Sequence, residues 1–292
     1  MCPYSLARSG LEPGGVCPLP ARRRIDLSVP SAARINDWLL DGQYNYEVDR
    51  MAGEQLLRLA PSSKEVARNN RWFLERVVRV MIEQFGIRQF IDFGSGLPTQ
   101  RNVHQVAQEL DPRSRVVYVD KDPVVLVHGH STLDEDDRTA LIPADIADTE
   151  YIFERREFKK LIDVQYPVGV LFNSVLHCVS DKNRPEQIVR RVVDRLQPGS
   201  AVAICHLVSD DDQLRHDLTE LMKKHTRNNW GRVRTRREVE EYFTDFLIQP
   251  PGLVDVTDWR PKSDLQRRQR SIEWFEYGGL AILPGGARAE HA

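Results

Sequence analysis

The sequence lacks the features that mark membrane-spanning and nucleic-acid-binding proteins. None of its apolar runs approaches the roughly 20 residues that a helix needs to cross a bilayer. Its formal net charge of −2 at pH 7 gives no electrostatic reason to expect nucleic acid or an anionic membrane as a partner. We therefore expect a soluble, cytoplasmic protein with neither kind of partner.

Cysteine is also scarce and is not arranged for cross-linking or metal binding. The four cysteines, Cys2, Cys17, Cys178 and Cys205, show no Cys-x-x-Cys spacing and have no cluster of histidines to match. This pattern argues against a disulfide framework or a zinc site and favours reduced thiols of the cytosol. No metal is expected.

The first quarter of the chain contains no predicted strand. Residues 1–24 are rich in Gly, Pro and Arg and lack a continuous apolar stretch, which predicts a disordered extension rather than a signal peptide. Residues 25–87 show helical periodicity, with Ser31 as an N-cap and Gly86 as a stop. We expect a helical lead-in there, one α/β domain over residues 88–285, and a short tail at 286–292.

Strands and helices alternate from Arg88 onward. The expected strands are Gln89–Phe93, Arg115–Val119, Ala140–Pro143, Val168–Ser174, Ser200–Leu207, Gly252–Trp259 and Ile272–Leu283. The expected helices are Asn102–Leu110, Pro123–His130, Thr149–Phe158, Arg184–Leu196, Asp211–Asn229 and Arg236–Phe246. Continuous apolar strands joined by helices predict a parallel, doubly wound sheet. The last two strands lack a crossover helix, which predicts an antiparallel hairpin at the sheet edge.

The chain is organised around a glycine turn at the end of the first expected strand. Asp92 precedes Phe93, and Gly94-Ser95-Gly96 follows. Glycines let backbone N–H groups approach a ligand closely. Asp120 ends the next strand, where an acid accepts hydrogen bonds from a ribose diol in doubly wound sheets. The pair predicts a site for a nucleoside-containing cofactor.

The glycine turn departs from the dinucleotide-binding pattern. A Gly-x-Gly-x-x-Gly fingerprint requires a third glycine, whereas Leu97-Pro98-Thr99 follows here. A carboxylate at Asp92 would attract an ammonium group and repel a pyrophosphate. These features count against a nicotinamide-dependent oxidoreductase, which stays open at this point as an alternative. A turn that serves only chain geometry also stays open.

Polar residues follow the third and fourth expected strands as well. Asp145 could accept a hydrogen bond from an adenine amino group while Ile146 packs on the ring, although capping of the next helix explains Asp145 equally well. Asn173 and His177 stand where the reacting part of a ligand lies in this architecture. His177 is the candidate general base, with a buried core histidine as the alternative.

These motifs occur in the order found in class I S-adenosylmethionine-dependent methyltransferases. More closely, the chain resembles an actinobacterial family of S-adenosyl methyltransferases once described as a domain of unknown function. The shared segments are Pro30–Gly42, Asn45 with Asp49-Arg50, Ala67–Arg71, Gly94–Thr99, Asn102–His104, the Asp120 segment and Tyr277–Gly279. The resemblance covers about residues 26–283.

The resemblance implies a Rossmann-like, seven-stranded sheet with an antiparallel last strand, and a helical lid over S-adenosylmethionine. The expected cofactor contacts are Asp92, Gly94, Ser95, Gly96, Asp120, Lys121, Asp145, Ile146 and Asn173, with Arg34, Tyr44 and Asn45 from the lid. We expect methylation of a small molecule of specialised metabolism, with Tyr44, Tyr46 and Trp230 beside the acceptor. A non-catalytic binding protein is the second alternative, and homo-oligomerisation stays open.

Overall fold

The computed structural model describes residues 26–99, 101–132, 137–261 and 273–285. The expected extension (1–24) and tail (286–292) lie outside these residues. The described chain begins with three helices, α1 (Ala32–Leu39), α2 (Glu47–Leu59) and α3 (Ser63–Phe85). Ser31 caps α1 by accepting a hydrogen bond from the Arg34 N–H at 3.2 Å, and Gly86 ends α3 with φ +66°. The helical lead-in is therefore present.

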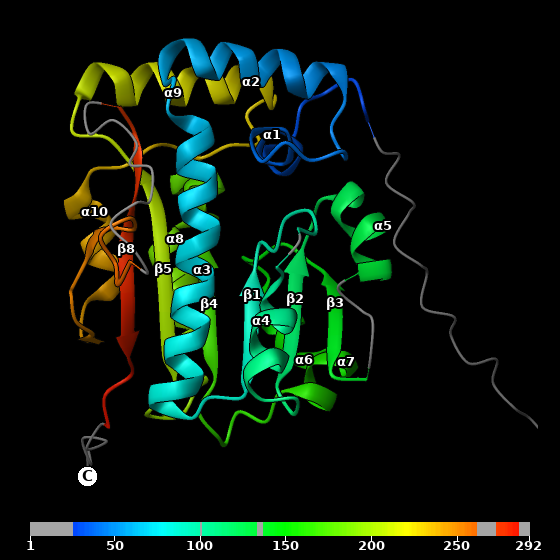
Figure 1. The fold of residues 1–292 in the computed structure, drawn as a ribbon, viewed down its shortest axis with the longest axis vertical. Helices are drawn as coiled ribbons and strands as arrows, with labels where there is room; N and C mark the ends of the chain where they lie inside the picture. Colours follow the sequence, from blue (N-terminus) through cyan, green and yellow to red (C-terminus); the bar gives the residue numbers. More distant parts are fainter. Residues whose placement is uncertain (1–25, 100, 133–136, 262–272, 286–292) are drawn as a thin grey trace, which may run out of the picture.

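One mixed, eight-stranded sheet forms the centre of the molecule (Figure 1). Its strands are β1 (Gln89–Phe93), β2 (Arg115–Asp120), β3 (Thr139–Pro143), β4 (Gly169–Asn173), β5 (Ala201–Val208), β6 (Leu247–Ile248), β7 (Val254–Asp255) and β8 (Phe275–Ile282). Their order is β3-β2-β1-β4-β5-β8-β6, and β7 also pairs with β8. Strands β1 to β5 run parallel, whereas β8 is antiparallel to its neighbours. The predicted α/β class and mostly parallel sheet are confirmed.

The remaining helices connect these strands. They are α4 (Val103–Leu110), α5 (Pro123–Thr132), α6 (Thr149–Glu154), α7 (Arg156–Leu161), α8 (Pro185–Val193), α9 (Asp212–His225) and α10 (Arg236–Glu240). Short 3-10 turns are η1 (Leu176–Cys178), η2 (Asp181–Asn183) and η3 (Glu241–Phe243).

Several predicted boundaries were wrong. The helix expected over Thr149–Phe158 divides at Arg155, whose extended backbone (φ −61°, ψ 140°) interrupts it. The strand expected over Gly252–Trp259 shortens to the two residues of β7, and β6 was not expected. The predicted antiparallel pairing of the last two expected strands is confirmed, because β7 pairs with β8. Strand β8 also pairs along its full length with β5, and β6 and β7 lie on its other side.

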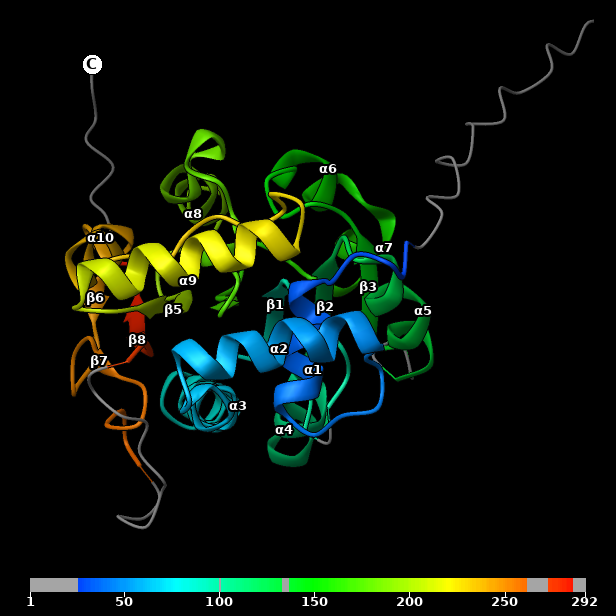
Figure 2. The ribbon, with the colours of Figure 1, turned by 90° about the horizontal axis from the view of Figure 1, so that it is seen from above.

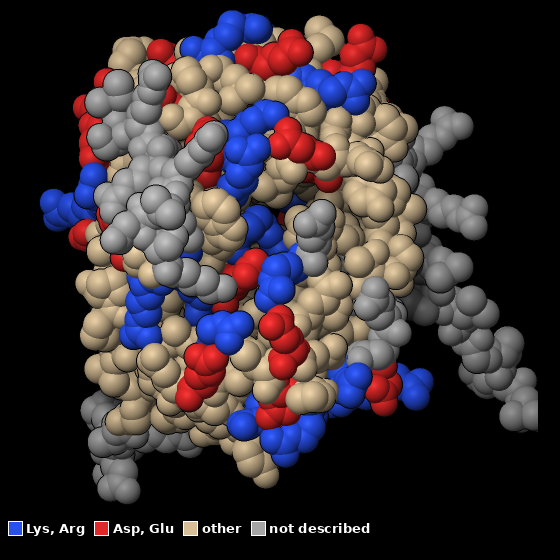
Figure 3. Space-filling model, in the orientation of Figure 1, with Lys and Arg blue, Asp and Glu red and all other residues tan. Residues whose placement is uncertain are grey.

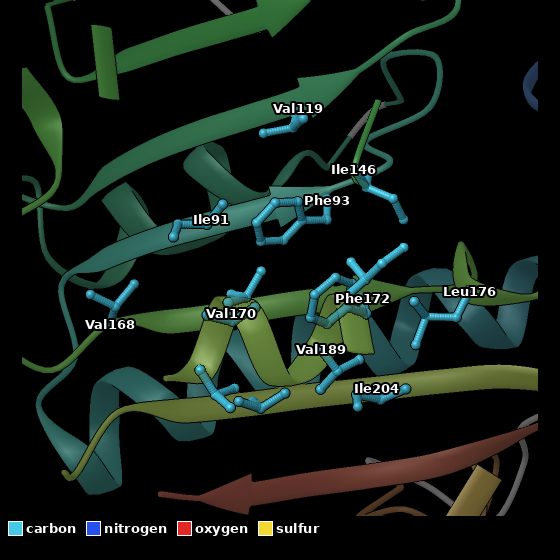
Figure 4. Close-up of a cluster of buried hydrophobic side chains, with 14 of the residues drawn as sticks. Ile91, Phe93, Val119, Ile146, Val168, Val170, Phe172, Leu176, Val189 and Ile204 are labelled. Atoms are coloured by element: carbon cyan, nitrogen blue, oxygen red, sulfur yellow. The ribbon is translucent and has the colours of Figure 1, made fainter. Parts of the chain in front are cut away.

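Helices cover both faces of the sheet, as the buried apolar strands require. Helices α3 and α4 lie on one face, and α6, α7, α8 and α10 lie on the other (Figures 1 and 2). Figure 4 shows one of these cores, where Val189 of α8 lies beside strand residues such as Val170. The rings of Phe93 and Phe172 stack there with centroids 4.8 Å apart.

A cap lies across the carboxyl ends of the strands. It consists of α1, α2 and α9, and Figure 2 shows these helices from above. Ile35, Leu56 and Met222 bury their side chains together in it, so segments far apart in sequence form one layer. Within the described residues, no helix combines the length and hydrophobicity that crossing a membrane would need.

Candidate functional site

A cavity of about 610 Å³ lies between the cap and the carboxyl ends of the strands. This volume is within the range of small-molecule sites. The turns that follow β1, β2, β3 and β4 form one side of the cavity, and residues of α1, α2, α3 and α9 form the other. Of the predicted site residues, the lining includes Asp92, Gly94, Ser95, Gly96, Asp120, Lys121, Asp145, Ile146, Asn173, His177 and Arg34.

The glycine turn has a backbone that only glycine adopts easily. Gly94 and Gly96 have φ of +71° and +67°. A Cβ on Gly94 would lie 2.2 Å from Cγ2 of Val175, whereas a Cβ on Gly96 would meet nothing within 4 Å. The turn is therefore packed against the protein at Gly94 and bordered by open space at Gly96. This is the geometry of a cradle that a ligand can approach.

Asp120 lies directly beside this turn. Its Oδ2 accepts a hydrogen bond from the Gly96 N–H at 2.9 Å, and its Oδ1 accepts one from the Asp122 N–H at 2.8 Å. A carboxylate offers about four lone pairs, so two remain for a ribose diol. Burial raises the pKa of Asp120 to about 6 despite these hydrogen bonds.

The residues after β2 and β3 meet at one end of the cavity. Lys121 Nζ forms a salt bridge of 2.9 Å with Asp145 Oδ2, and both side chains are partly exposed. Asp145 Oδ1 accepts a hydrogen bond from the Ala147 N–H at 3.0 Å, while Ile146 is buried. Asp145 does not cap the next helix, because α6 begins at Thr149 with Asp148 as its N-cap. The contact with the Ala147 N–H is a local turn contact, and Asp145 lines the cavity.

Asp92 and Arg71 together form a second polar part of the wall. Asp92 is buried, and burial raises its pKa to about 7 while the charge of Arg71 opposes that rise. Arg71 donates hydrogen bonds to Thr99 Oγ1 at 2.6 Å and to the Arg101 carbonyl at 2.7 Å. Burial lowers the pKa of Arg71. The opposite charges of Asp92 and Arg71, which influence each other electrostatically, match the charges of a free amino acid group.

Arg71 was not among the predicted site residues, although the sequence carries a signal for it. It lies on α3 with Ala67 and Asn70, and all three line the cavity. The spacings i, i+3 and i+4 put these residues on one face of a helix. The sequence signal for Arg71 is a polar pair on an otherwise apolar helix face.

Asn173 takes part in a buried hydrogen-bonded network. Its Nδ2 donates to Asn70 Oδ1 at 2.8 Å, and its Oδ1 accepts from the Cys205 thiol at 3.1 Å. Asn70 Nδ2 in turn donates to Cys205 Sγ at 3.2 Å. The network fixes the end of β4 against α3 and β5.

His177 lines the cavity but has the environment of a core residue. Its ring is buried, lies 4.9 Å from the Trp230 ring and 5.3 Å from the His206 ring, and accepts a long hydrogen bond of 3.5 Å from the Leu207 N–H. Burial and the nearby charge of Arg234 lower the pKa of His177 to about 3. The ring is neutral at pH 7 and is a weak proton acceptor.

Of the three lid residues expected to contact the cofactor, one lines the cavity and two do not. Arg34 lines the cavity, but its guanidinium is buried, forms a 2.9 Å salt bridge with Asp49 and also donates to the Val29 carbonyl. Tyr44 and Asn45 are not in the cavity wall, because they belong to the turn before α2. Tyr44 stacks on His128 with ring centroids 4.0 Å apart, and Asn45 Nδ2 donates to Asp37 Oδ2 at 2.8 Å.

Of the aromatic residues expected beside the acceptor, only Trp230 lines the cavity. Trp230 lines the cavity and is buried, as is Trp274, which was not predicted. Tyr46 is not in the cavity wall and precedes α2, where the Arg34 guanidinium lies 5.4 Å from its ring. Glu276 of β8 is a further buried cavity residue that the sequence did not single out.

Comparisons with known proteins show which family the chain belongs to. A sequence model of the S-adenosyl methyltransferase family matches residues 19–284. The structure of a DUF574 family protein from Streptomyces avermitilis is 32% identical with a TM-score of 0.81, and the comparison covers 89% of this chain and 100% of that chain. A candidate methyltransferase from Thermobifida fusca is 35% identical, also with a TM-score of 0.81, over 92% and 100%.

A more distant solved structure is similar in fold. The plantazolicin methyltransferase BamL, solved with S-adenosylhomocysteine and a triazolic desmethylPZN analogue, is 11% identical with a TM-score of 0.51 over 87% of this chain and 96% of its own. A search of curated proteins finds no match to the sequence.

The mostly parallel sheet with an inserted antiparallel last strand, and the glycine turn held by an acid from the next strand, are the features that the resemblance to S-adenosylmethionine-dependent methyltransferases implied. The family model covers most of the sequence, so the chain belongs to the S-adenosyl methyltransferase family. S-Adenosylmethionine is its cofactor, as the resemblance implied. The family match decides against the nicotinamide-dependent alternative.

Proposed function

We propose that the chain transfers the methyl group of S-adenosylmethionine to a small organic molecule of specialised metabolism. The observation that carries this proposal is one cavity with a polar part at the strand ends and an apolar part beneath the cap. The cofactor supplies an activated methyl carbon when it is bound, so the protein has to align the acceptor and manage charge.

We assign the polar groups of the cavity to the groups of the cofactor one by one. We assign the ribose diol to Asp120. The space beside Gly96 is assigned to the part of the cofactor next to the ribose. The amino group and carboxylate of the methionyl portion suit Asp92 and Arg71, whose charges are opposite to theirs. Lys121, Asp145 and Ile146 border the adenine in this assignment, and Ser95 and Asn173 complete the wall.

The apolar part of the cavity provides room for the acceptor. Its side chains come from the cap, the end of β5, the segment after α9 and the residue before β8, and they are Leu39, Leu56, Leu207, Met222, Trp230 and Trp274. We propose that residues 25–87 act as a lid over the methyltransferase domain of residues 88–285. In this proposal the uncharged His177 ring lines the cavity beside Trp230 and does not act as the base, since its lowered pKa makes it a weak base.

On the face drawn in Figure 3, the described residues do not gather positive charge in one place. Lysine and arginine alternate with aspartate and glutamate over the face drawn in Figure 3. A nucleic-acid site would gather positive charge on one face. Cys178 and Cys205 are both unpaired, which fits the cytoplasmic location that we also propose.

The test is a screen of small molecules with the purified protein and S-adenosylmethionine. We expect one class of compound to gain the mass of a methylene group while S-adenosylhomocysteine accumulates. Gly94→Ala is the control, because its Cβ would lie 2.2 Å from Val175 and the φ of +71° disfavours alanine, so the glycine turn would have to shift. Methylation of protein or nucleic acid alone, with no small-molecule product, would overturn the proposal.

A further inference from the structure

The most unusual residue of the acceptor side is Glu276, whose side chain lines the cavity from β8. It is 2% exposed, and its Oε2 has no hydrogen-bond partner. Within the described residues it forms no salt bridge with a lysine or arginine. A buried carboxylate without a cation is costly, so such a group points to a ligand that completes it.

The orientation of Glu276 is fixed by Ser174, which follows β4. The Ser174 hydroxyl donates a hydrogen bond to Glu276 Oε1. Ser174 itself has a φ of +60°, a left-handed conformation that is uncommon for a residue with a side chain. Strained backbone of this kind concentrates at functional sites. One carboxylate oxygen is thus held in place, and the other is left for a partner.

The groups around Glu276 favour a cationic partner. Cys205 of β5, Cys178 of η1 and Asp255 of β7 are the titratable groups that influence it, and none carries a positive charge. Trp230 and Trp274 line the same cavity, and indole rings attract cations. The Trp230 Nε1–H is also buried without a partner, so it can donate to a second polar atom of the ligand.

We propose that Glu276 is the acceptor-binding carboxylate, and that the methyl acceptor is an apolar molecule with an amine nitrogen. The proposal rests on the proposed small-molecule function of the same cavity. Glu276 pairs with the amine as an ammonium ion and then takes its proton on Oε2, which frees the nitrogen lone pair. That pair forms the bond to the methyl carbon as the carbon–sulfur bond breaks, and the electron pair of that bond stays on sulfur.

The proton-accepting role fits the carboxyl group of Glu276. Burial raises the pKa of Glu276 to about 7, and the hydrogen bond from the Ser174 hydroxyl opposes only part of that rise. A carboxylate with this pKa is a stronger base than an exposed glutamate. It is also a stronger base than His177, which lines the same cavity.

The test compares matched amines and alcohols that differ only in the polar group. The probes are three pairs: 4-butylbenzylamine and 4-butylbenzyl alcohol, naphthylmethylamine and naphthylmethanol, and octylamine and octanol. Each compound is titrated by calorimetry into the protein saturated with S-adenosylhomocysteine. At pH 8 we expect at least one amine to bind at least tenfold more tightly than its alcohol. Glu276→Gln should remove this preference and leave the affinity for S-adenosylhomocysteine within about twofold.

Two variants separate binding from folding. Glu273→Gln changes another buried glutamate near the start of β8 that does not line the cavity, and it should keep the amine preference. Ser174→Gly suits the φ of +60° and removes the hydroxyl that lowers the pKa of Glu276. Amine binding, which tightens as the carboxylate forms above pH 7, should therefore shift to higher pH in this variant.

Three results of the binding experiments would overturn the inference. They are equal affinity for amines and alcohols, an amine preference that survives in Glu276→Gln, and no binding by any amine of the panel. Methylation of alcohols but not amines in the product screen would also overturn it, while leaving the small-molecule function intact. Absence of any small-molecule product would instead count against the function itself.

Discussion

One oxygen of the Asp120 carboxylate accepts a hydrogen bond of 2.9 Å from the backbone N–H of Gly96. This contact joins the turn after β1 to the end of β2, and it holds both at the edge of the same cavity. The glycine turn and the acid are therefore one unit. A ligand that meets the turn also meets the remaining lone pairs of the carboxylate.

Asp120→Ala should weaken binding of S-adenosylhomocysteine by about 1.5–3 kcal/mol, the range for hydrogen bonds that involve a charged group. The loss should be similar for 5′-methylthioadenosine, because both ligands carry the ribose diol. Calorimetric titration measures both affinities. Asp148→Ala is the matched control, since Asp148 is exposed and does not line the cavity. Unchanged affinity in Asp120→Ala would remove this residue from the site.

Arg71→Met should weaken S-adenosylhomocysteine binding while leaving 5′-methylthioadenosine binding nearly unchanged. The second ligand lacks the amino acid group that we assign to Arg71 and Asp92. A loss of at least tenfold is expected for the first ligand, because a buried charge pair is removed. The same titrations give the result. If both ligands weaken equally, Arg71 acts on the fold of the turn, through Thr99, rather than on the ligand.

The affinity for S-adenosylhomocysteine should rise with pH between 6.5 and 8.5. Burial raises the pKa of Asp92 to about 7, so the carboxyl group is partly protonated below that pH and cannot pair with the ligand ammonium. The dissociation constant should fall by up to about tenfold per pH unit below the pKa. Asp92→Asn should bind more weakly at pH 8 and show no such dependence. An equal slope in this variant would assign the titration to another group.

Ionisation of Asp92 favours ligand binding but lowers the stability of the ligand-free protein. Because the folded-state pKa of Asp92 lies above the unfolded value, its contribution to stability is fully present below about pH 4. That contribution is lost as the pH rises through about 7. Asp92→Asn should therefore gain thermal stability relative to the unchanged protein between pH 5 and 8. Thermal unfolding followed by circular dichroism tests this control.

The sequence was sufficient where local patterns determine structure. Apolar runs such as Val116–Val119 predicted buried strands, and Gly86 predicted the left-handed end of α3. The glycine turn and Asp120 were predicted because both follow strands that pair in parallel, which brings the ends of those strands together. These inferences need only short-range geometry and one rule of sheet topology.

The rest of the site depends on packing between distant segments. Arg71 meets Asp92 only because α3 crosses the sheet, and Glu276 meets Ser174 only because β8 inserts beside β5. Arg34 was expected to contact the cofactor, but its guanidinium forms a salt bridge with Asp49. No local sequence pattern reveals that salt bridge. The low pKa of His177 likewise follows from burial beside Arg234, which is distant in sequence.

His177→Ala should lower stability by about 2–4 kcal/mol, because truncation of a large buried side chain leaves a cavity beside Trp230. Affinity for S-adenosylhomocysteine should change less than about threefold. The folded-state pKa of His177, about 3, lies below the unfolded value of about 6.5. The stabilisation that this difference provides is present above pH 6.5 and is lost as the pH falls toward 3, so the two proteins should converge in acid. Denaturant titrations at pH 7.5 and 4.5 measure this convergence. A variant that folds normally, binds S-adenosylhomocysteine and no longer methylates the acceptor found in the screen would restore His177 as the base and remove Glu276 from that role.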